Sequence, residues 1–178
     1  EVFNHSVYDK ERKKPIHNIQ SRIKKKQSIE EKLMRDGRAP SVSSAKDYLQ
    51  DIAGIRVICY FVRDVELLMK NLKSQSELIV IKEKDYINHP KPNGYRSYHI
   101  VLGVPVCYLD SQEYYPVEIQ IRTLGMDFWA SMEHRICYKR ERDDKQEIQE
   151  VLLRYAAQLK EMEDDFEQYN DLRELSQK

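Results

Sequence analysis

The segment from residue 117 to 123 reads Val-Glu-Ile-Gln-Ile-Arg-Thr and alternates apolar and polar side chains. Successive side chains of a β-strand point to opposite faces of the sheet, so this segment predicts a strand with one apolar and one polar face. Its polar residues are Glu118, Gln120 and Arg122. Such a polar face is the wall of a site where other parts of the chain cover it, and a solvated surface where they do not.

Other segments complete the prediction of the fold. Runs of branched apolar residues predict strands at 54–61, from 78 to 81, at 98–108 and at 115–122. Helical spacing of apolar residues predicts helices from 28 to a stop at 37, at 45–49, at 64–72 and at 126–138. The first 20 residues lack clear periodicity and are expected to be part helix and part loop. We expect an α+β domain at 1–140 with a mostly antiparallel or mixed sheet flanked by helices.

Three residues carry capping signals for the predicted helices. Ser28 precedes Glu31 by three positions, which is the spacing of a capping box, and Gly37 supplies a C-terminal stop. Asp64 is predicted to be the N-cap of the helix that follows the first predicted strand.

Residues 141–178 are predicted to be a long C-terminal helical extension. Apolar residues there step alternately by four and three positions, as in a coiled-coil seam. They are Ile148, Leu152, Tyr155, Leu159, Met162, Phe166 and Tyr169. This segment holds 6 basic and 12 acidic residues, whereas residues 1–46 hold 12 and 6, so the net charge of zero hides a gradient. We expect the basic end to bind an anion and the acidic tail to be a solvated assembly helix with no catalytic part.

Length and composition exclude several classes of protein. The chain has 178 residues and a mean hydropathy of −0.75, and no apolar run approaches the ~18 residues of a membrane span. No basic-then-apolar leader opens the chain, so we expect a soluble, cytoplasmic protein of bacterial type with one self-sufficient core. Cys59, Cys107 and Cys137 have no C-x-x-C spacing and are expected to be buried, reduced thiols.

Basic residues crowd the segment before the first predicted helix. Ser21, Arg22 and Lys24 lead into the helix expected at Ser28. Cations at a helix N-terminus add to the helix dipole and suit a polyphosphate. A solvated basic face explains the same residues equally well.

Two carboxylates are candidates for a divalent cation. Asp51 and Arg56 flank the entrance to the strand at 54–61, which would place a metal ligand beside a guanidinium for phosphate. On spacing alone, a local ion pair with a helix cap is the simpler interpretation. Asp51 together with Glu118 would hold a metal that neutralises phosphate charge during phosphoryl transfer.

The richest functional segment lies between two predicted strands, at residues 82–99. It contains Lys82-Glu83-Lys84-Asp85-Tyr86 and then the run KPNGYRSYH at 91–99. Pro and Gly fix a loop, Lys, Asn, Arg, Ser and His supply anion contacts and hydrogen bonds, and Tyr95 offers a ring on which a base can stack. A functional loop explains this density better than a simple turn.

Several common templates are absent from the sequence. There is no G-x-x-x-x-G-K-[ST], G-x-G-x-x-G, H-E-x-x-H or G-x-S-x-G motif, so the usual nucleotide-binding, zinc-protease and serine-hydrolase patterns fail. His89, His99 and His134 have no metal-ligand spacing, which argues against zinc.

Five strings together resemble the synthetase domain of the RelA/SpoT family. They are SRIKKKQSIEEKL, DIAGIRVIC, KDYINHPKPNGYRSYH, VEIQIRT and MDFWASMEH, in the family's order within residues 16–139. The resemblance implies a nucleotidyltransferase-like mixed sheet flanked by helices. It also implies a GTP pyrophosphokinase of the stringent response, which moves the β,γ-pyrophosphoryl group of ATP to the 3′-hydroxyl of GTP or GDP and yields AMP and pppGpp or ppGpp. The short length resembles a small alarmone synthetase without hydrolase or regulatory domains.

The resemblance also implies a role for each matching residue. The ATP side comprises Arg22, Lys24, Ser28, Lys32 and Arg56. The GTP side comprises Lys84, Lys91, Asn93, Tyr95, His99, Gln120 and, more loosely, Arg122, with Tyr95 as the stacking ring. Asp51 matches the Mg²⁺ ligand, and Glu118 matches the catalytic carboxylate that binds the metal and takes the proton of the 3′-hydroxyl.

Further expectations concern specificity and partners. The string Lys82-Glu83-Lys84-Asp85 is nearer to the family's basic R-x-K-D form than to its acidic E-x-D-D form, which leaves metal dependence and the choice between GTP and GDP open. The family implies a homotetramer, to which the seam at 148–169 would contribute, and alarmone or RNA as regulators. Two alternatives are pyrophosphorylation of the tRNA 3′ end, as in toxin relatives, and a non-catalytic RNA-binding module. The intact KPNGYRSYH loop favours a free guanine nucleotide, and retention of Asp51 and Glu118 favours an enzyme.

Overall fold

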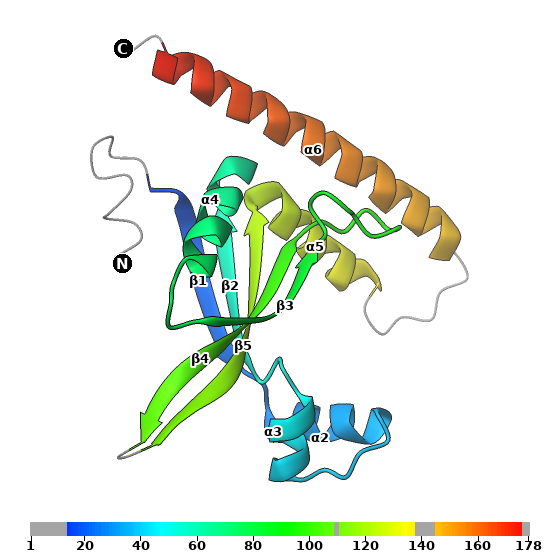
Figure 1. Ribbon diagram of the computed structural model, residues 1–178. Coiled ribbons are helices and arrows are strands. Elements are labelled where there is room, and N and C mark those ends of the chain that lie inside the picture. The colour runs from blue at the N-terminus through cyan, green and yellow to red at the C-terminus, as the bar shows by residue number, and fades with distance from the viewer. Residues whose placement is uncertain (1–13, 109–110, 138–144, 176–178) are drawn as a thin grey trace.

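A computed structural model describes residues 14–108, 111–137 and 145–175 of the chain. Within these residues, one sheet has the strand order β1-β2-β5-β4-β3 (Figure 1). Its strands are β1 (Ile16–Ile23), β2 (Ala53–Cys59), β3 (Ile79–Asp85), β4 (Tyr98–Tyr108) and β5 (Ser111–Thr123). β2 and β5 pair in parallel, whereas the other three pairings are antiparallel. The prediction of a mixed sheet is therefore confirmed.

Helices flank this sheet on both faces and at both ends. They are α2 (Lys26–Arg35), α3 (Val42–Tyr48), α4 (Val62–Lys73), α5 (Leu124–Cys137) and α6 (Lys145–Leu175). α2 and α3 lie beyond one end of the sheet, and α6 crosses the other end beside α5 and the start of α4 (Figure 1). No helix in the described part of the chain combines the length and the apolar character that crossing a membrane requires.

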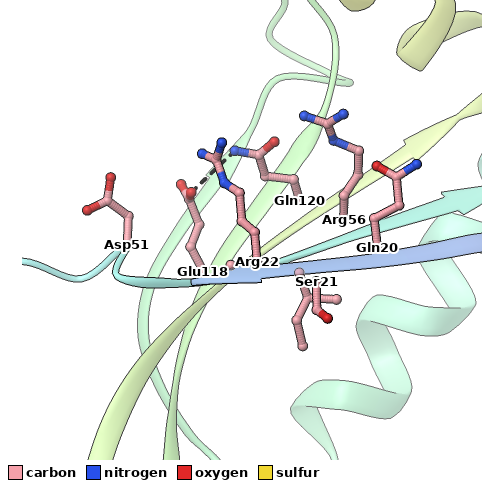
Figure 2. Close-up of a pocket in the computed structure, with 9 residues that line it drawn as sticks. Gln20, Ser21, Arg22, Asp51, Arg56, Glu118 and Gln120 are labelled. Carbon is pink, nitrogen blue, oxygen red and sulfur yellow. Dashed lines mark hydrogen bonds between the residues drawn. The ribbon is translucent and has the colours of Figure 1, made fainter. Parts of the chain in front are cut away.

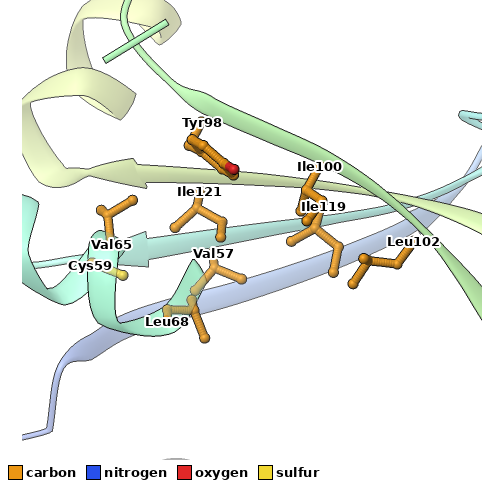
Figure 3. Close-up of a cluster of buried hydrophobic side chains, with 9 residues drawn as sticks. All are labelled: Val57, Cys59, Val65, Leu68, Tyr98, Ile100, Leu102, Ile119 and Ile121. Carbon is orange, nitrogen blue, oxygen red and sulfur yellow. The ribbon is translucent and has the colours of Figure 1, made fainter. Parts of the chain in front are cut away.

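The two faces of β5 differ as the alternating sequence predicts. Glu118 and Gln120 point to one side of the sheet (Figure 2), whereas Ile119 and Ile121 lie in the core on the other side (Figure 3). α4 covers this core. The buried cluster comprises Val57, Cys59, Val65, Leu68, Tyr98, Ile100, Leu102, Ile119 and Ile121. The apolar face therefore fixes the sheet against α4 and leaves the polar face for a site.

The segment at 16–23 is a strand, where the sequence predicted part helix and part loop. Residues 1–13 of that prediction lie outside the described part of the chain. β1 is an edge strand, paired with β2 on one side, and all of its side chains after Ile16 are exposed. An exposed edge strand needs no apolar alternation, which is why the sequence signal failed there.

α2 begins at Lys26, so Ser28 lies inside the helix and the predicted capping box is wrong. The backbone N–H of Lys24 donates to the carbonyl of Ile52 at 2.8 Å, which keeps the chain extended alongside β2 until the helix starts. The stop at Gly37 is confirmed. Its φ is +70°, and the N–H of Arg38 closes the helix end onto the carbonyl of Leu33 at 2.8 Å.

The next two helices also start earlier than predicted. α3 starts at Val42 instead of Ala45, because the Ser41 side chain accepts the N–H of Ser44 at 3.1 Å. α4 starts at Val62, so Asp64 lies in its first turn and is not the N-cap. Its carboxylate still accepts a hydrogen bond from the backbone N–H of Phe61, the N-cap residue, at 3.1 Å. Asp64 therefore pairs a free backbone donor at the start of the helix.

The cysteines do not share one environment. Cys59 is fully buried in the core, where burial raises the pKa of its thiol to about 12. Cys107 and Cys137 are exposed, so the prediction of buried thiols is wrong for these two. Cys107 pairs with Gln112 close to the turn of the β4–β5 hairpin, and Cys137 is the last residue of α5.

α6 packs against α5 through part of its predicted seam. Trp129 and Ala130 of α5 are buried against Leu152 and Ala156 of α6, and the indole N–H of Trp129 donates to the carbonyl of Leu152 at 2.8 Å. Ile148 and Leu159 pack against the same cluster. The other seam residues are 47–70% exposed: Tyr155, Met162, Phe166 and Tyr169. The predicted domain boundary between residues 140 and 141 lies outside the described residues.

Candidate active site

The polar face of the sheet carries side chains in rows that run across the strands. The pairing registers place one residue from each strand in the first row: Gln20, Arg56, Gln120, His99 and Lys84. The next row is Arg22, Gly54, Glu118, Val101 and Lys82. Neighbouring strands are about 4.8 Å apart, so each row brings residues distant in sequence onto one continuous surface.

Two cavities lie on this face and meet at two carboxylates. The first, about 250 Å³, is lined by Gln20, Arg22, Arg56 and Gln120 together with Asp51 and Glu118 (Figure 2). The second, about 310 Å³, is lined by Lys32, Lys82, Lys84 and His99 together with the same Asp51 and Glu118. The two carboxylates therefore stand at the junction of two cavities whose walls are rich in cations.

Asp51 lies between α3 and β2, where two lysines fix its carboxylate. Its Oδ2 accepts hydrogen bonds from Nζ of Lys24 at 2.5 Å and Nζ of Lys32 at 2.8 Å. Burial acts to raise the pKa of Asp51, but the hydrogen bonds from the two ammonium groups outweigh it, so the pKa lies below its ordinary value. Its Oδ1 is buried and accepts no hydrogen bond from the described residues.

The buried Oδ1 of Asp51 fits a metal that arrives with a nucleotide. Mg²⁺ is commonly bound through one or two protein carboxylates plus the phosphates of the substrate. Asp51 and Glu118 line the same two cavities and supply two carboxylates. Within the described residues no three His, Cys, Asp or Glu side chains cluster as a metal site, so a cation here would depend on substrate oxygens for its remaining ligands.

Glu118 is held in its charged form by its neighbours. Its Oε1 lies 3.6 Å from Nδ1 of His99, and its Oε2 accepts a hydrogen bond from Nε2 of Gln120 at 3.2 Å. The interaction with His99 lowers the pKa of Glu118 and outweighs the opposing effect of burial. A carboxylate that is ionised at neutral pH can accept a proton or bind a cation.

Arg122 is buried behind the first row and ties it to the loop before β4. Its guanidinium donates to the hydroxyl of Tyr95 at 2.7 Å and to Oε1 of Gln120 at 3.1 Å. It also donates to Asp127 at 3.0 Å. The Tyr95 hydroxyl is 2.8 Å from Nε2 of His99. The network therefore places Tyr95, His99 and Gln120 relative to one another.

The loop at 91–95 is shaped by Asn93 and Gly94. The Asn93 side chain accepts the backbone N–H of Tyr95 at 3.1 Å, and Gly94 has a φ of +89°, which favours glycine. The ammonium of Lys91 lies 4.9 Å from the ring centre of Tyr95 and 5.0 Å from that of Tyr86. The ammonium of Lys91 therefore lies close to two aromatic rings, those of Tyr86 and Tyr95, in the segment between β3 and β4.

The predicted site residues fall into four groups. Arg22, Lys32, Arg56, Lys84, His99, Gln120, Asp51 and Glu118 line one or both cavities. Lys24, Tyr95 and Arg122 line neither cavity but form hydrogen bonds with residues that do. Lys91 and Asn93 belong to the loop beside Tyr95, whereas Ser28 is exposed on α2 and lines neither cavity.

Sequence reasoning missed several residues of this surface, among them Asp36, Tyr48 and Gln50 in the wall of the second cavity. Gln20 lies in the first row. Residues two apart on a strand share a face, so its position two residues before Arg22 could have indicated that both belong to the site. Asp127 accepts a hydrogen bond from Arg122, and its carboxylate lies 3.6 Å from the Arg56 guanidinium. Its place in the first turn of the helix after Arg122 gave no comparable signal.

Comparisons with known proteins identify relatives of this chain. The chain is 45% identical over 138 residues to GTP pyrophosphokinase YwaC of Bacillus subtilis (78% of this chain, 66% of that protein). It is 40% identical over 126 residues to GTP pyrophosphokinase YjbM of the same organism (70% of this chain, 58% of that protein). The chain therefore spans less than two thirds of the length of these curated relatives.

A solved structure extends the similarity to nearly the whole chain. The crystal structure of small alarmone synthetase 1 from Bacillus subtilis, bound to its product pppGpp, superposes with a TM-score of 0.81. It is 30% identical and covers 97% of this chain and 87% of that one. The protein-family model RelA_SpoT, described as the region found in RelA and SpoT proteins, matches residues 21–143, which is more than half of the sequence. The chain belongs to the RelA/SpoT family.

Proposed function

We propose that this chain transfers the β,γ-pyrophosphoryl group of ATP to the 3′-hydroxyl of GTP or GDP and releases AMP and pppGpp or ppGpp. The observation that carries the proposal is the pair of cavities that meet at Asp51 and Glu118. Two substrates that react with each other need adjoining sites, and two polyphosphates need cationic walls. Membership of the RelA/SpoT family and the similarity to proteins named GTP pyrophosphokinases support the same reaction.

In this proposal the first cavity binds ATP. Arg22 and Arg56 line it, and Lys24 and Lys32 stand at its junction with the second cavity through their bonds to Asp51. Four cations at this place offset the charge of a triphosphate and orient it. Ser28, on α2 close in sequence to these lysines, completes the set that the family motif assigns to ATP.

The second cavity binds the acceptor guanine nucleotide. Lys84 and His99 line it, and Tyr95, with Lys91 near its ring, offers the surface on which guanine stacks. Gln120 supplies a side-chain amide beside Glu118, and Arg122 holds Gln120 and Tyr95 in place. Asn93 keeps the loop in the conformation that presents Tyr95.

Glu118 is placed between the two nucleotides to remove the acceptor proton. As that proton moves to Glu118, the 3′-oxygen forms a bond to the β-phosphorus of ATP. The bond from that phosphorus to the oxygen bridging the α- and β-phosphates breaks, and AMP leaves with that oxygen. Bound Mg²⁺, held by Asp51 and Glu118, would neutralise charge on the transferred phosphates. Arg22 and Arg56 orient the same phosphates from the wall of the cavity.

The proposal is tested by following the label of γ-³²P-ATP in the presence of Mg²⁺ and either GTP or GDP. We expect the label in a guanosine 3′-pyrophosphate, resolved by thin-layer chromatography, and an equal amount of unlabelled AMP, measured by its ultraviolet absorbance after ion-exchange chromatography. A parallel reaction contains deacylated tRNA together with GTP. Preferential labelling of tRNA would replace the proposal by tRNA pyrophosphorylation, and salt-sensitive RNA binding without any product would replace it by an RNA-binding module.

We further propose that the exposed apolar side of α6 is covered by other copies of the chain in a homotetramer. Phe166 and Tyr169 are 59% and 70% exposed, and Phe128 of α5 is 58% exposed. An apolar groove of about 680 Å³ between α5 and α6 contains Phe128, Tyr155 and Met162. Exposed apolar surface of this extent is typical of interaction sites.

Replacing Phe166 by glutamate is expected to reduce the assembly from about four times the 21.3 kDa chain mass to a smaller species. The substitution places a charge where apolar surface is to be buried, which association does not tolerate without a partner charge. Size-exclusion chromatography with light scattering measures the mass. Gln168→Glu adds the same charge at another exposed position of α6 and should leave the mass unchanged. An unchanged mass for Phe166→Glu would remove Phe166 from the interface.

A further inference from the structure

Two of the five glycines lie where an added Cβ would collide with α6. A Cβ at Gly94 would lie 2.7 Å from the Cβ of Ala156, and a Cβ at Gly125 would lie 2.7 Å from the carboxylate of Glu163. At the other three glycines an added Cβ would meet no atom closer than 3.4 Å. The backbone therefore comes close to α6 at both glycines, and at Gly94 an added Cβ would meet the Cβ of Ala156, which cannot move aside on its own.

The first contact fixes the loop that carries Tyr95. Gly94 is buried between Asn93 and Tyr95, and its positive φ and its approach to Ala156 leave no room for another residue. The ring of Tyr95 packs edge-on against Trp129, with 6.3 Å between ring centres, and Trp129 donates to the backbone of α6. The loop is thus held between α5 and α6.

The second contact centres on Glu163, a largely buried carboxylate of α6. Its Oε1 accepts the backbone N–H of Gly125 at 2.9 Å, which satisfies a free donor in the first turn of α5. Its Oε2 lies 3.6 Å from the guanidinium of Arg96, and both side chains are only 10–12% exposed. Thr123 also hydrogen-bonds to Glu163.

The partners of Glu163 are the sequence neighbours of the two residues that organise the acceptor side. Arg96 directly follows Tyr95, and Thr123 directly follows Arg122. Gly125 lies in the first turn of the helix whose Asp127 accepts a hydrogen bond from Arg122. A shift of Glu163 would therefore move Arg96 and Thr123, and each of these is joined by a peptide bond to Tyr95 or Arg122.

We infer that α6 positions the acceptor side of the site, with Ala156 and Glu163 as positioning residues for Tyr95 and Arg122. The inference rests on the proposed function, and it revises the sequence-based expectation that the C-terminal helix has no catalytic part. Its two contacts converge on the loop and on the start of α5, next to the residues assigned to the acceptor. The residues assigned to ATP lie on or near β1, β2 and α2, and one of them, Arg56, is linked to the start of α5 through Asp127 at 3.6 Å. Disturbing the contacts of α6 should therefore weaken acceptor binding more than ATP binding.

The first test compares Ala156→Val with Ala157→Val, which places the same change at an exposed position one residue along α6. Both carry the same helix-propensity cost, but only Ala156→Val pushes against Gly94. We expect Ala156→Val to raise the KM for GTP or GDP by about 10- to 100-fold, because small misplacements of a binding group have effects of this size. The KM for ATP should change by less than about threefold, and Ala157→Val should match the wild type.

The second test replaces Glu163 by glutamine, with Glu161→Gln as the exposed control on the same helix. Glutamine still accepts the N–H of Gly125 but removes the charge that faces Arg96. We expect a rise of about tenfold in the acceptor KM with ATP binding retained. This variant keeps the inference testable should Ala156→Val fail to fold, because it adds no volume.

Equilibrium binding separates the inference from the proposed function. Affinities for GDP alone and for α,β-methylene ATP alone are measured by isothermal titration calorimetry, without turnover. A selective loss of GDP affinity in Ala156→Val and Glu163→Gln supports the positioning role. Equal loss of both affinities, or no loss in either variant, overturns it while the wild type remains active. A wild type that forms no guanosine 3′-pyrophosphate overturns the proposed function itself.

Discussion

Replacing Glu118 by glutamine is expected to lower kcat for the proposed pyrophosphoryl transfer by about 1,000-fold, within the range that a general base contributes. The amide has nearly the size of the carboxylate and can still accept the hydrogen bond that Gln120 donates at 3.2 Å. It cannot take a proton at neutral pH and brings no negative charge for a cation. Because neighbouring groups already lower the pKa of Glu118, the wild-type side chain is ionised at neutral pH and the whole effect should be visible there.

Glu113→Gln provides the matched control for this variant. Glu113 lies on the same strand, is exposed and lines neither cavity, and its ion pair with Lys46 at 3.4 Å is solvated. Exposed pairs of this kind contribute little to stability. Initial rates at saturating ATP and GTP, with thermal unfolding followed by circular dichroism, measure both variants. A kcat for Glu118→Gln within about tenfold of the wild type would exclude the role of Glu118 as the base.

The sheet was predictable where burial imposes a period on the sequence. The alternation at 117–123 predicted both faces of β5, because a strand with one face against α4 must alternate. β4 was predicted with the bounds that the structure has, Tyr98–Tyr108. β1 was missed, since an exposed edge strand is selected for neither an apolar face nor a helical pattern. Tertiary pairing with β2 forms that strand, and single-sequence reasoning does not see such pairing.

Helix starts depended on contacts outside the local sequence. Ser28 has the residue type and spacing of a cap, but the bond from Lys24 to Ile52 sets where the extended chain ends, so the helix begins at Lys26. Gly37 was predicted correctly because a positive φ after a helix is a property of the residue itself. Local chemistry therefore predicted the stop, and tertiary contact determined the start.

Residue types predicted the constituents of the site, whereas the register of the sheet brings them together. Asp51 and Glu118 are far apart in sequence, and the parallel pairing of β2 with β5 places Glu118 opposite Gly54, close to where Asp51 enters the strand. Gln20 was not predicted because β1 was not predicted to be a strand. Asp127 was not predicted because an aspartate in the first turn of a helix is common for structural reasons alone. The seam of α6 was a single apolar row in sequence, yet only part of it packs on α5.

Replacing Asp51 by asparagine is expected to lower kcat by about 100-fold or more and to raise the Mg²⁺ concentration needed for half-maximal rate by at least about tenfold. The variant loses the carboxylate whose buried Oδ1 accepts no hydrogen bond from the described residues. It also releases the ammonium groups of Lys24 and Lys32 from their shared partner. Rates measured across a MgCl₂ series give both values. Asp47→Asn, at an exposed position of α3, is the matched control and should behave as the wild type.

The same variant has a stability signature with a defined pH dependence. Although burial opposes it, hydrogen bonding from the two lysines places the folded-state pKa of Asp51 below the ordinary value of 3.8. The carboxylate therefore stabilises the fold above that value, and this contribution is lost as the pH falls through the lower, folded-state pKa. The wild type should have a higher Tm than Asp51→Asn at pH 7, by a few degrees at most because the carboxylate is 27% exposed, and the difference should shrink as the pH is lowered below 3.8. A Tm difference that does not change across this pH range would show that the two lysines do not stabilise the charged form of Asp51.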